Sequence, residues 1–112
     1  MVTDQIPEYD IIIHEDDRLI RSIDVNNESD GSDYSFTGFS ATMKVDATRP
    51  ATSTVDATYT SSGGDITLTA GNVAIDCVHG LSVGEYLYDF IITTGTKNTT
   101  LFTGRITVKE SI

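Results

Sequence analysis

The sequence predicts an all-β domain, a sandwich or barrel of seven or eight short strands. Three observations lead to this prediction. Apolar and polar residues alternate in several segments, and the apolar spacing of a helix is sustained nowhere in the 112 residues. Threonine is the most frequent residue, and with Ile and Val it suits a pleated surface better than a helix. Turn residues separate the segments at intervals of ~8–14 residues.

Each expected strand is an apolar or alternating segment that ends at a turn. An acidic turn at 15–17 joins the first two strands, and a polar, glycine-bearing loop at 26–35 follows them. The pattern is strongest at 84–94, where aromatic and apolar residues occupy every second position from Tyr86 to Ile92. The eight expected strands cover residues 9–14, 18–25, 39–46, 53–60, 65–69, 72–78, 84–94 and 99–109.

The position of Tyr86 indicates which kind of sandwich to expect. It lies just inside the start of the penultimate strand, as the tyrosine corner of immunoglobulin-like sandwiches does, and it is either such a corner or a simple core residue. We expect an immunoglobulin-like antiparallel β-sandwich of seven to eight short strands. Residues 9–112 form this single domain, and the polar residues 1–8, which include Pro7, form an N-terminal arm.

The composition excludes several classes of protein. No apolar run approaches the ~18 residues that cross a bilayer, and no basic segment followed by an apolar one indicates secretion. One cysteine cannot close an internal disulfide or build a multi-thiolate metal site. The formal charge of −10 disfavours nucleic acid as a partner, because cationic side chains supply most of that affinity. We expect no cofactor, no nucleic acid and no membrane contact.

The negative charge is concentrated in the first third of the chain. Residues 1–33 carry a net charge of −8, whereas residues 34–112 carry −2. The predicted sandwich is therefore nearly neutral, and the acidic residues belong to the arm, the turn at 15–17 and the loop up to residue 33. This distribution suits a docking module better than an active site, and it predicts that the acidic end of the domain meets the partner.

Cys77 and His79 are the sharpest enzymatic pattern in the sequence. They lie two residues apart on one strand and could share a face, as a nucleophile and its base must. However, Cys77 is in register with Val73 and Ile75 on the expected core face, where a cysteine behaves as a small hydrophobic residue. We therefore expect no enzyme. Two carboxylate pairs are equally weak candidates for acid–base chemistry and are interpreted as solvated: Asp16 with Asp17, and Asp76 with Asp89.

The acidic loop at 24–33 has some features of a calcium site. Asn26, Glu28 and Asp30 followed by Gly31 resemble the opening of an EF-hand loop. The twelfth position is Thr37 instead of a bidentate Glu, and no helices flank the loop, so an EF-hand is rejected. A looser calcium site and a solvated acidic loop stay open as alternatives, and the solvated loop is the preferred interpretation.

Two groups of apolar residues are candidates for assembly contacts. Ile11, Ile12 and Ile13 form an unbroken β-branched run, and such a strand is either covered by its own domain or paired with a neighbouring copy. Leu87 and Ile91 lie opposite the core face of the strand at 84–94 and form a second apolar stripe. A further packed layer or a subunit contact would explain both groups.

Several segments together resemble a known family. The resemblance covers residues 10–109 and is carried mainly by turn glycines and core positions. The segments are IHEDD at 13–17, YSFTGFSATMKV at 34–45, GDITL at 64–68, NVAID at 72–76, VGEYLYDF at 83–90 and LFTGRITV at 101–108. The chain resembles the small immunoglobulin-like β-sandwich proteins of tailed bacteriophages, and it is similar in plan to the N-terminal domain of the phage upper-baseplate family.

The resemblance implies a non-enzymatic structural protein of the virion, made in the cytoplasm of a bacterial host. It would be an adaptor of the tail or baseplate that docks on other phage structural proteins and on copies of itself, through its arm and strand edges. The family's long C-terminal extension has no counterpart here, so a capsid decoration or head-fibre protein is the alternative. A carbohydrate- or calcium-dependent binding module is the alternative from another class.

Overall fold

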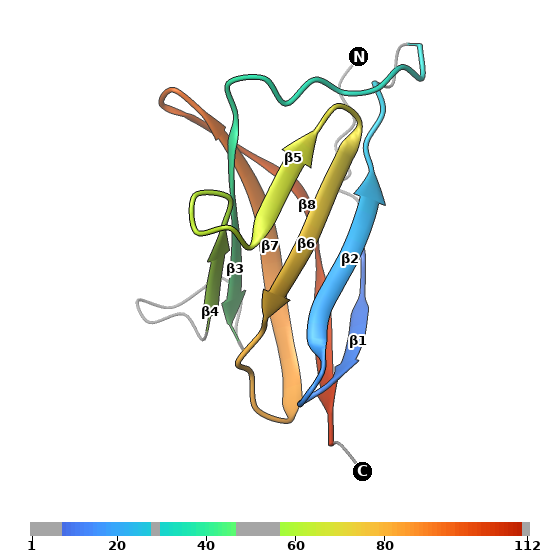
Figure 1. Ribbon diagram of the computed structural model, residues 1–112, viewed down its shortest axis with the longest axis vertical. Coiled ribbons are helices and arrows are strands. Elements are labelled where there is room, and N and C mark those ends of the chain that lie inside the picture. Colours follow the sequence, from blue (N-terminus) through green and yellow to red (C-terminus); the bar gives the residue numbers. More distant parts are fainter. Residues whose placement is uncertain (1–7, 28–29, 47–56, 111–112) are drawn as a thin grey trace.

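The computed structural model describes residues 8–27, 30–46 and 57–110, and it confirms the all-β prediction (Figure 1). No helix occurs in these three ranges. The strands are β1 (Ile11–His14), β2 (Arg18–Asp24), β3 (Ser40–Asp46), β4 (Ala57–Thr60), β5 (Ile66–Thr69), β6 (Asn72–Val78), β7 (Gly84–Thr94) and β8 (Lys97–Lys109).

The strands form two packed sheets. One has the order β1-β8-β7-β3-β4, and the other, which lies in front of it in Figure 1, has the order β2-β6-β5. In an immunoglobulin sandwich, strands B, E and D lie in one sheet and strands C, F and G lie in the other. Here β2, β6 and β5 take the places of B, E and D, and β3, β7 and β8 take those of C, F and G. The predicted immunoglobulin-like sandwich is therefore confirmed. One pairing is parallel, that of β1 with β8, and the other pairings of the named strands are antiparallel.

The strand boundaries agree closely with the predicted ones. β6 and β7 match the prediction at both ends. The expected strand at 53–60 lies partly outside the described residues, and its described part is β4. β8 begins at Lys97, two residues earlier than expected, because Gly95 and Thr96 alone make the turn after β7 and Gly95 has a φ of 58°. The expected arm at 1–8 lies outside the described residues except for Glu8, which bridges to Thr103.

The core lies between the two sheets and follows the predicted alternation. Every second residue of the long strands points inward, and the aromatic rings of Phe90 and Phe102 stack at 4.6 Å between their centres. Buried hydrophobic residues of the five-stranded sheet include Ala41, Met43, Val45, Tyr59, Tyr88, Phe90, Ile92, Phe102, Ile106 and Val108, and those of the three-stranded sheet are Leu19, Ile66, Val73, Ile75 and Cys77.

The contacts of Tyr9 and Asp10 explain why β1 starts later than predicted. The carbonyl oxygen of Tyr9 accepts a hydrogen bond from the hydroxyl of Tyr88, and it lies so close to Gly104 that any Cβ there would overlap it. The side-chain oxygen Oδ1 of Asp10 accepts a hydrogen bond from the backbone N–H of Arg105 at 3.1 Å. A side chain here takes the role that a backbone carbonyl group has in a regular strand pairing. The regular pairing with β8 begins only after this point.

Tyr86 has the geometry of a tyrosine corner. Its hydroxyl donates a hydrogen bond to the carbonyl oxygen of Ser82 at 2.8 Å, four residues upstream, across the turn that leads into β7. This back-bonding to the preceding turn is what defines the corner in immunoglobulin-like sandwiches. Of the two interpretations that the sequence left open, the corner is confirmed.

Candidate docking surfaces

The isoleucine run of β1 is divided by the alternation of the strand. Ile11 and Ile13 point into the core and are 1 % and 5 % exposed, whereas Ile12 points outward and is 59 % exposed. Ile11 and Ile13 are therefore covered by their own domain and are not available to pair with a neighbouring copy. Only Ile12 remains as a candidate contact residue in this strand.

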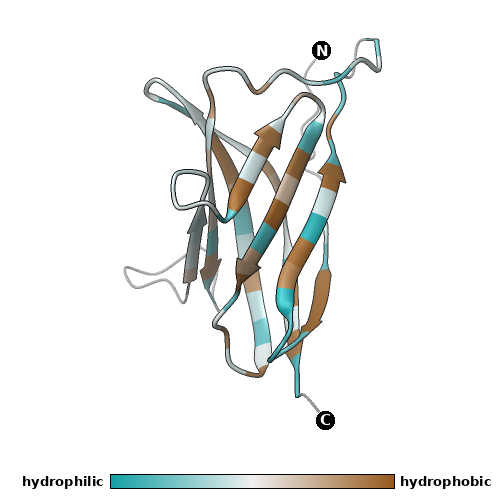
Figure 2. Cartoon of the chain, in the orientation of Figure 1, coloured by the Kyte–Doolittle hydropathy of each residue, from teal (hydrophilic) through white to brown (hydrophobic). Residues whose placement is uncertain are grey.

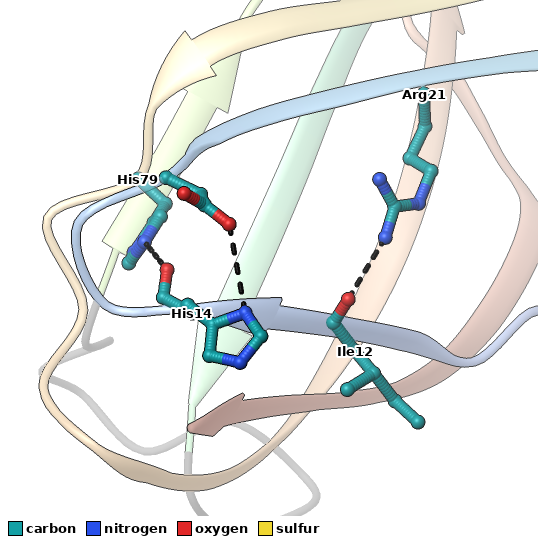
Figure 3. A network of polar contacts seen from close by, with 5 residues as sticks. Ile12, His14, Arg21 and His79 are labelled. Carbon is teal, nitrogen blue, oxygen red and sulfur yellow. Dashed lines mark hydrogen bonds and ion pairs between the residues drawn. The ribbon is translucent and has the colours of Figure 1, made fainter. Parts of the chain in front are cut away.

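The free edge of β1 is the side that does not face β8, and side chains of the other sheet bind it (Figure 3). A guanidinium N–H of Arg21 in β2 donates a hydrogen bond to the carbonyl oxygen of Ile12 at 3.0 Å. The ring of His79, just after β6, lies 3.2 Å from the carbonyl oxygen of His14 through its Nε2 atom. Two carbonyl groups that a neighbouring strand would need are thus already bound within the domain.

Leu87 and Ile91 point outward from β7 on the five-stranded sheet, as predicted, but both are half-buried. Asp89 lies between them, opposite Lys44 on one neighbouring strand and Thr103 on the other. The two apolar side chains therefore do not form a continuous stripe. Leu87 lines a shallow hollow of about 430 Å³, together with Glu8, Asp10, Thr103, Gly104 and Arg105.

The outer face of the three-stranded sheet carries a patch that sequence reasoning missed. Ile20 and Val78 are 56 % and 73 % exposed there. In the register of β2 and β6, Ile20 lies opposite Asp76 and Arg18 lies opposite Val78. Arg18 and Asp76 form an ion pair at 2.8 Å, so the pair runs diagonally between the two apolar side chains. We call these four residues the outer-face patch.

A feature of the sequence could have identified the outer-face patch. Along β2 and β6, inward positions are marked by Leu19 and by Val73, Ile75 and Cys77, so Ile20 and Val78 occupy positions where alternation predicts polar residues. Figure 2 shows the resulting bands of apolar and polar residues along the front sheet. A β-branched residue at a position where the alternation predicts a polar one indicates an exposed apolar surface.

The acidic segments do not gather at one end of the domain. The turn at 15–17 precedes β2 and the loop up to residue 33 follows it, so the two segments lie at opposite ends of the sandwich (Figure 1). The expectation of a single acidic docking end is corrected accordingly. Between the two ends, the outer-face patch contains one positive and one negative side chain and is neutral.

The described part of the acidic loop is a tight hairpin held by its own polar groups. The N–H of Asn27 donates to the carbonyl oxygen of Ser32 at 2.8 Å, and the N–H of Gly31 donates to the carbonyl oxygen of Asn27 at 2.8 Å. Asp30 accepts hydrogen bonds from the hydroxyl of Ser32 at 2.6 Å and from its N–H at 3.0 Å. These bonds favour the carboxylate and lower the pKa of Asp30 below its usual value.

The candidate calcium site gains no support from side-chain geometry. In the described ranges, no three His, Cys, Asp or Glu side chains are grouped so that they could hold a metal ion. Glu28, one of the expected ligands, lies outside those ranges. The oxygen Oδ1 of Asp30, another expected ligand, is bound to Ser32 within the hairpin.

Cys77 and His79 are both buried, but their surroundings do not activate a nucleophile. His79 accepts a hydrogen bond from the N–H of Leu81 at Nδ1, 2.9 Å away, so its proton lies on Nε2 and is donated to the carbonyl oxygen of His14. Both ring nitrogens are therefore engaged in holding backbone groups. Burial raises the pKa of the Cys77 thiol to about 11, so the thiolate is scarce at neutral pH.

The carboxylate pairs are not arranged for acid–base chemistry. Asp76 and Asp89 lie on different sheets, and Asp76 is bound to Arg18. Asp17 lies 3.6 Å from the ring of His14 in an exposed pair, which is also drawn in Figure 3. An exposed pair of this kind contributes at most ~1 kcal/mol to stability.

The comparisons with known proteins leave the function to be argued from the residues. No protein-family model matches the chain, and no curated protein matches it. Within the described ranges, no helix is long and apolar enough to cross a membrane.

Proposed function

We propose that this protein is a non-enzymatic structural module of a bacteriophage virion, which docks on other structural proteins of the particle. The tail or baseplate is the proposed location, and the capsid surface is the alternative. The proposal combines the family resemblance of residues 10–109 with the surface of the sandwich. The observation that carries it is the outer-face patch, where two β-branched side chains remain exposed on either side of an ion pair.

The outer-face patch suits a protein partner for two physical reasons. Covering the exposed parts of Ile20 and Val78 contributes about 1 kcal/mol per side chain, on the usual scale of apolar area removed from water. The Arg18–Asp76 pair is more than half exposed at both side chains and contributes little to the stability of the free domain. Because the two charges neutralise each other, a partner that covers the outer-face patch buries no unpaired charge.

Weak contacts of this size are effective when they are repeated by symmetry. A particle presents many equivalent binding positions, and simultaneous contacts raise the overall affinity without any new interaction at a single site. A module with a small neutral patch between two acidic ends also keeps a net charge far from zero, which limits non-specific association in the free state.

The test is to find the protein in assembled particles. Phage particles are produced from the genome that carries the gene, purified on a density gradient and analysed by quantitative mass spectrometry. We expect the protein in the particle fraction at many copies per particle. Particles that are complete and infectious without it, with all of the protein left in the unassembled fraction, would contradict the proposal.

A further inference from the structure

Both sheets of the sandwich end in an edge strand on the same side of the molecule. β1 is the edge of the five-stranded sheet, and β2 is the edge of the three-stranded sheet. In β1 and directly beside it, the backbone hydrogen-bonding groups of the odd-numbered residues point toward β8. The N–H of Tyr9, before β1, donates to the carbonyl oxygen of Thr103, and the N–H of Glu15, after β1, donates to that of Lys109. Because backbone groups alternate along a strand, those of Ile12 and His14 point away from β8, toward the free edge.

The carbonyl group of Ile20 points to the free edge of β2 by the same reasoning. Asp76, its partner in the register, donates its N–H to the carbonyl oxygen of Asp65 on the opposite side of β6. Ile20 and Asp76 are therefore a pair without mutual hydrogen bonds, and the backbone groups of Ile20 face away from β6.

Arg21 binds a carbonyl oxygen on each of these two free edges. Its guanidinium donates to Ile12 of β1 at 3.0 Å and to Ile20 of β2 at 2.7 Å. Arg21 lies on the same face of β2 as the buried Leu19, so it is a charged residue on the core-facing side of an edge strand. Charges in that position are one means by which β proteins prevent edge-to-edge pairing.

His79 completes the cover of the β1 edge. Its Nε2 atom donates to the carbonyl oxygen of His14, while Nδ1 is held by the N–H of Leu81. The ring is buried, and the carbonyl group of the same residue accepts a hydrogen bond from the hydroxyl of Tyr59. His79 is thus fixed by the fold, whereas Arg21 is only half-buried and is the part of the cover that a substitution can remove cleanly.

We propose that Arg21, supported by His79, closes the free edge of β1 against pairing with β1 of a second copy. A two-fold axis at this edge would align two β1 strands antiparallel and bring the exposed Ile12 of each copy beside the other. With Arg21 in place, the carbonyl group of Ile12 is occupied and two guanidinium groups would approach each other. This inference does not rest on the proposed function, since it concerns the edge and not the outer-face patch.

The experiment compares Arg21→Met with Arg105→Met by sedimentation velocity over a range of concentrations. Methionine keeps the apolar stem but removes the guanidinium donors, and Arg105 is an exposed arginine of β8 that lies outside both the β1 edge and the outer-face patch. We expect Arg21→Met to self-associate at least about tenfold more tightly than the wild type, while Arg105→Met does not. In the associated form, the amides of Ile12 and His14 should gain protection from hydrogen exchange.

Two further variants decide the interpretation. Adding Ile12→Lys to Arg21→Met should return the association to the wild-type level, because two like charges would meet across the two-fold axis. Arg21→Lys keeps the charge but replaces the planar fork by a single ammonium group, and it should associate to an intermediate degree. Folded Arg21→Met that sediments like the wild type overturns the proposal. If Arg21→Met does not fold, Arg21→Lys decides alone: association above that of the wild type supports the proposal, and equal association overturns it.

Discussion

The β1 edge and the outer face of the three-stranded sheet both carry exposed β-branched side chains, but their surroundings differ. At β1, Ile12 lies between two buried isoleucines, and the carbonyl groups of the strand are bound by Arg21 and His79. On the outer face, Ile20 and Val78 lie on either side of an ion pair that is itself exposed. The carbonyl groups at the β1 edge thus already have hydrogen-bond donors within the domain, whereas the outer face has exposed apolar area that a partner can cover.

The largest expected effect is the difference in stability between substitutions at two neighbouring residues of β1. Ile11→Asp should lower the free energy of unfolding by more than about 4 kcal/mol, because it places an unpaired charge in the core. Ile12→Asp should change it by less than about 1 kcal/mol, since that side chain already faces water. Urea unfolding followed by circular dichroism measures both. Similar losses for the two variants would mean that the β1 run is not divided as described.

A substitution of His79, which binds the same edge, should have a smaller effect on stability. His79→Leu keeps much of the side-chain volume but leaves the carbonyl group of His14 and the N–H of Leu81 without the ring nitrogens that bind them. We expect a loss of about 2–3 kcal/mol in the free energy of unfolding. Asp17→Asn, which alters only the exposed pair with His14, is the control and should cost less than about 0.5 kcal/mol. A loss in His79→Leu no larger than the control would contradict the role of this ring.

The strands could be predicted from the sequence because alternation reports directly which side of a strand is buried. Ala41, Met43 and Val45, for example, occupy every second position and are all buried. The same rule identified Tyr86 as a possible corner, since its place at the start of a strand is a local property.

Other features depend on contacts between distant segments and could not be predicted. The parallel pairing of β1 with β8 and the register shift between Phe90 and Ile91 leave no trace in the alternation of either strand. The cover of the β1 edge by Arg21 depends on how two sheets meet. The outer-face patch is different, because Ile20 and Val78 could have been identified from their positions on the polar side of β2 and β6.

A further expected effect, seen only at alkaline pH, concerns the pH dependence of Cys77. Burial raises the pKa of its thiol to about 11 in the folded protein, above the value of about 8.5 for an unfolded chain. The unfolded state therefore loses this proton first, and the contribution of Cys77 to stability is lost as the pH rises from about 9 toward 11. We expect the melting temperature of Cys77→Ala to decline less over that pH range than the melting temperature of the wild type. An identical decline in the two proteins would contradict the assignment of a raised pKa to the buried thiol.

The most direct test of the docking account compares the outer-face patch with the β1 edge on assembled particles. Particles lacking this protein are incubated with the wild type, with Ile20→Asp and with Ile12→Asp, and the bound amount is measured after sedimentation. Both variants exchange an exposed isoleucine for the same charged residue, so they differ only in location. We expect Ile20→Asp to lose most of the binding and Ile12→Asp to bind like the wild type. Undiminished binding of Ile20→Asp would contradict the assignment of the outer-face patch as the docking surface.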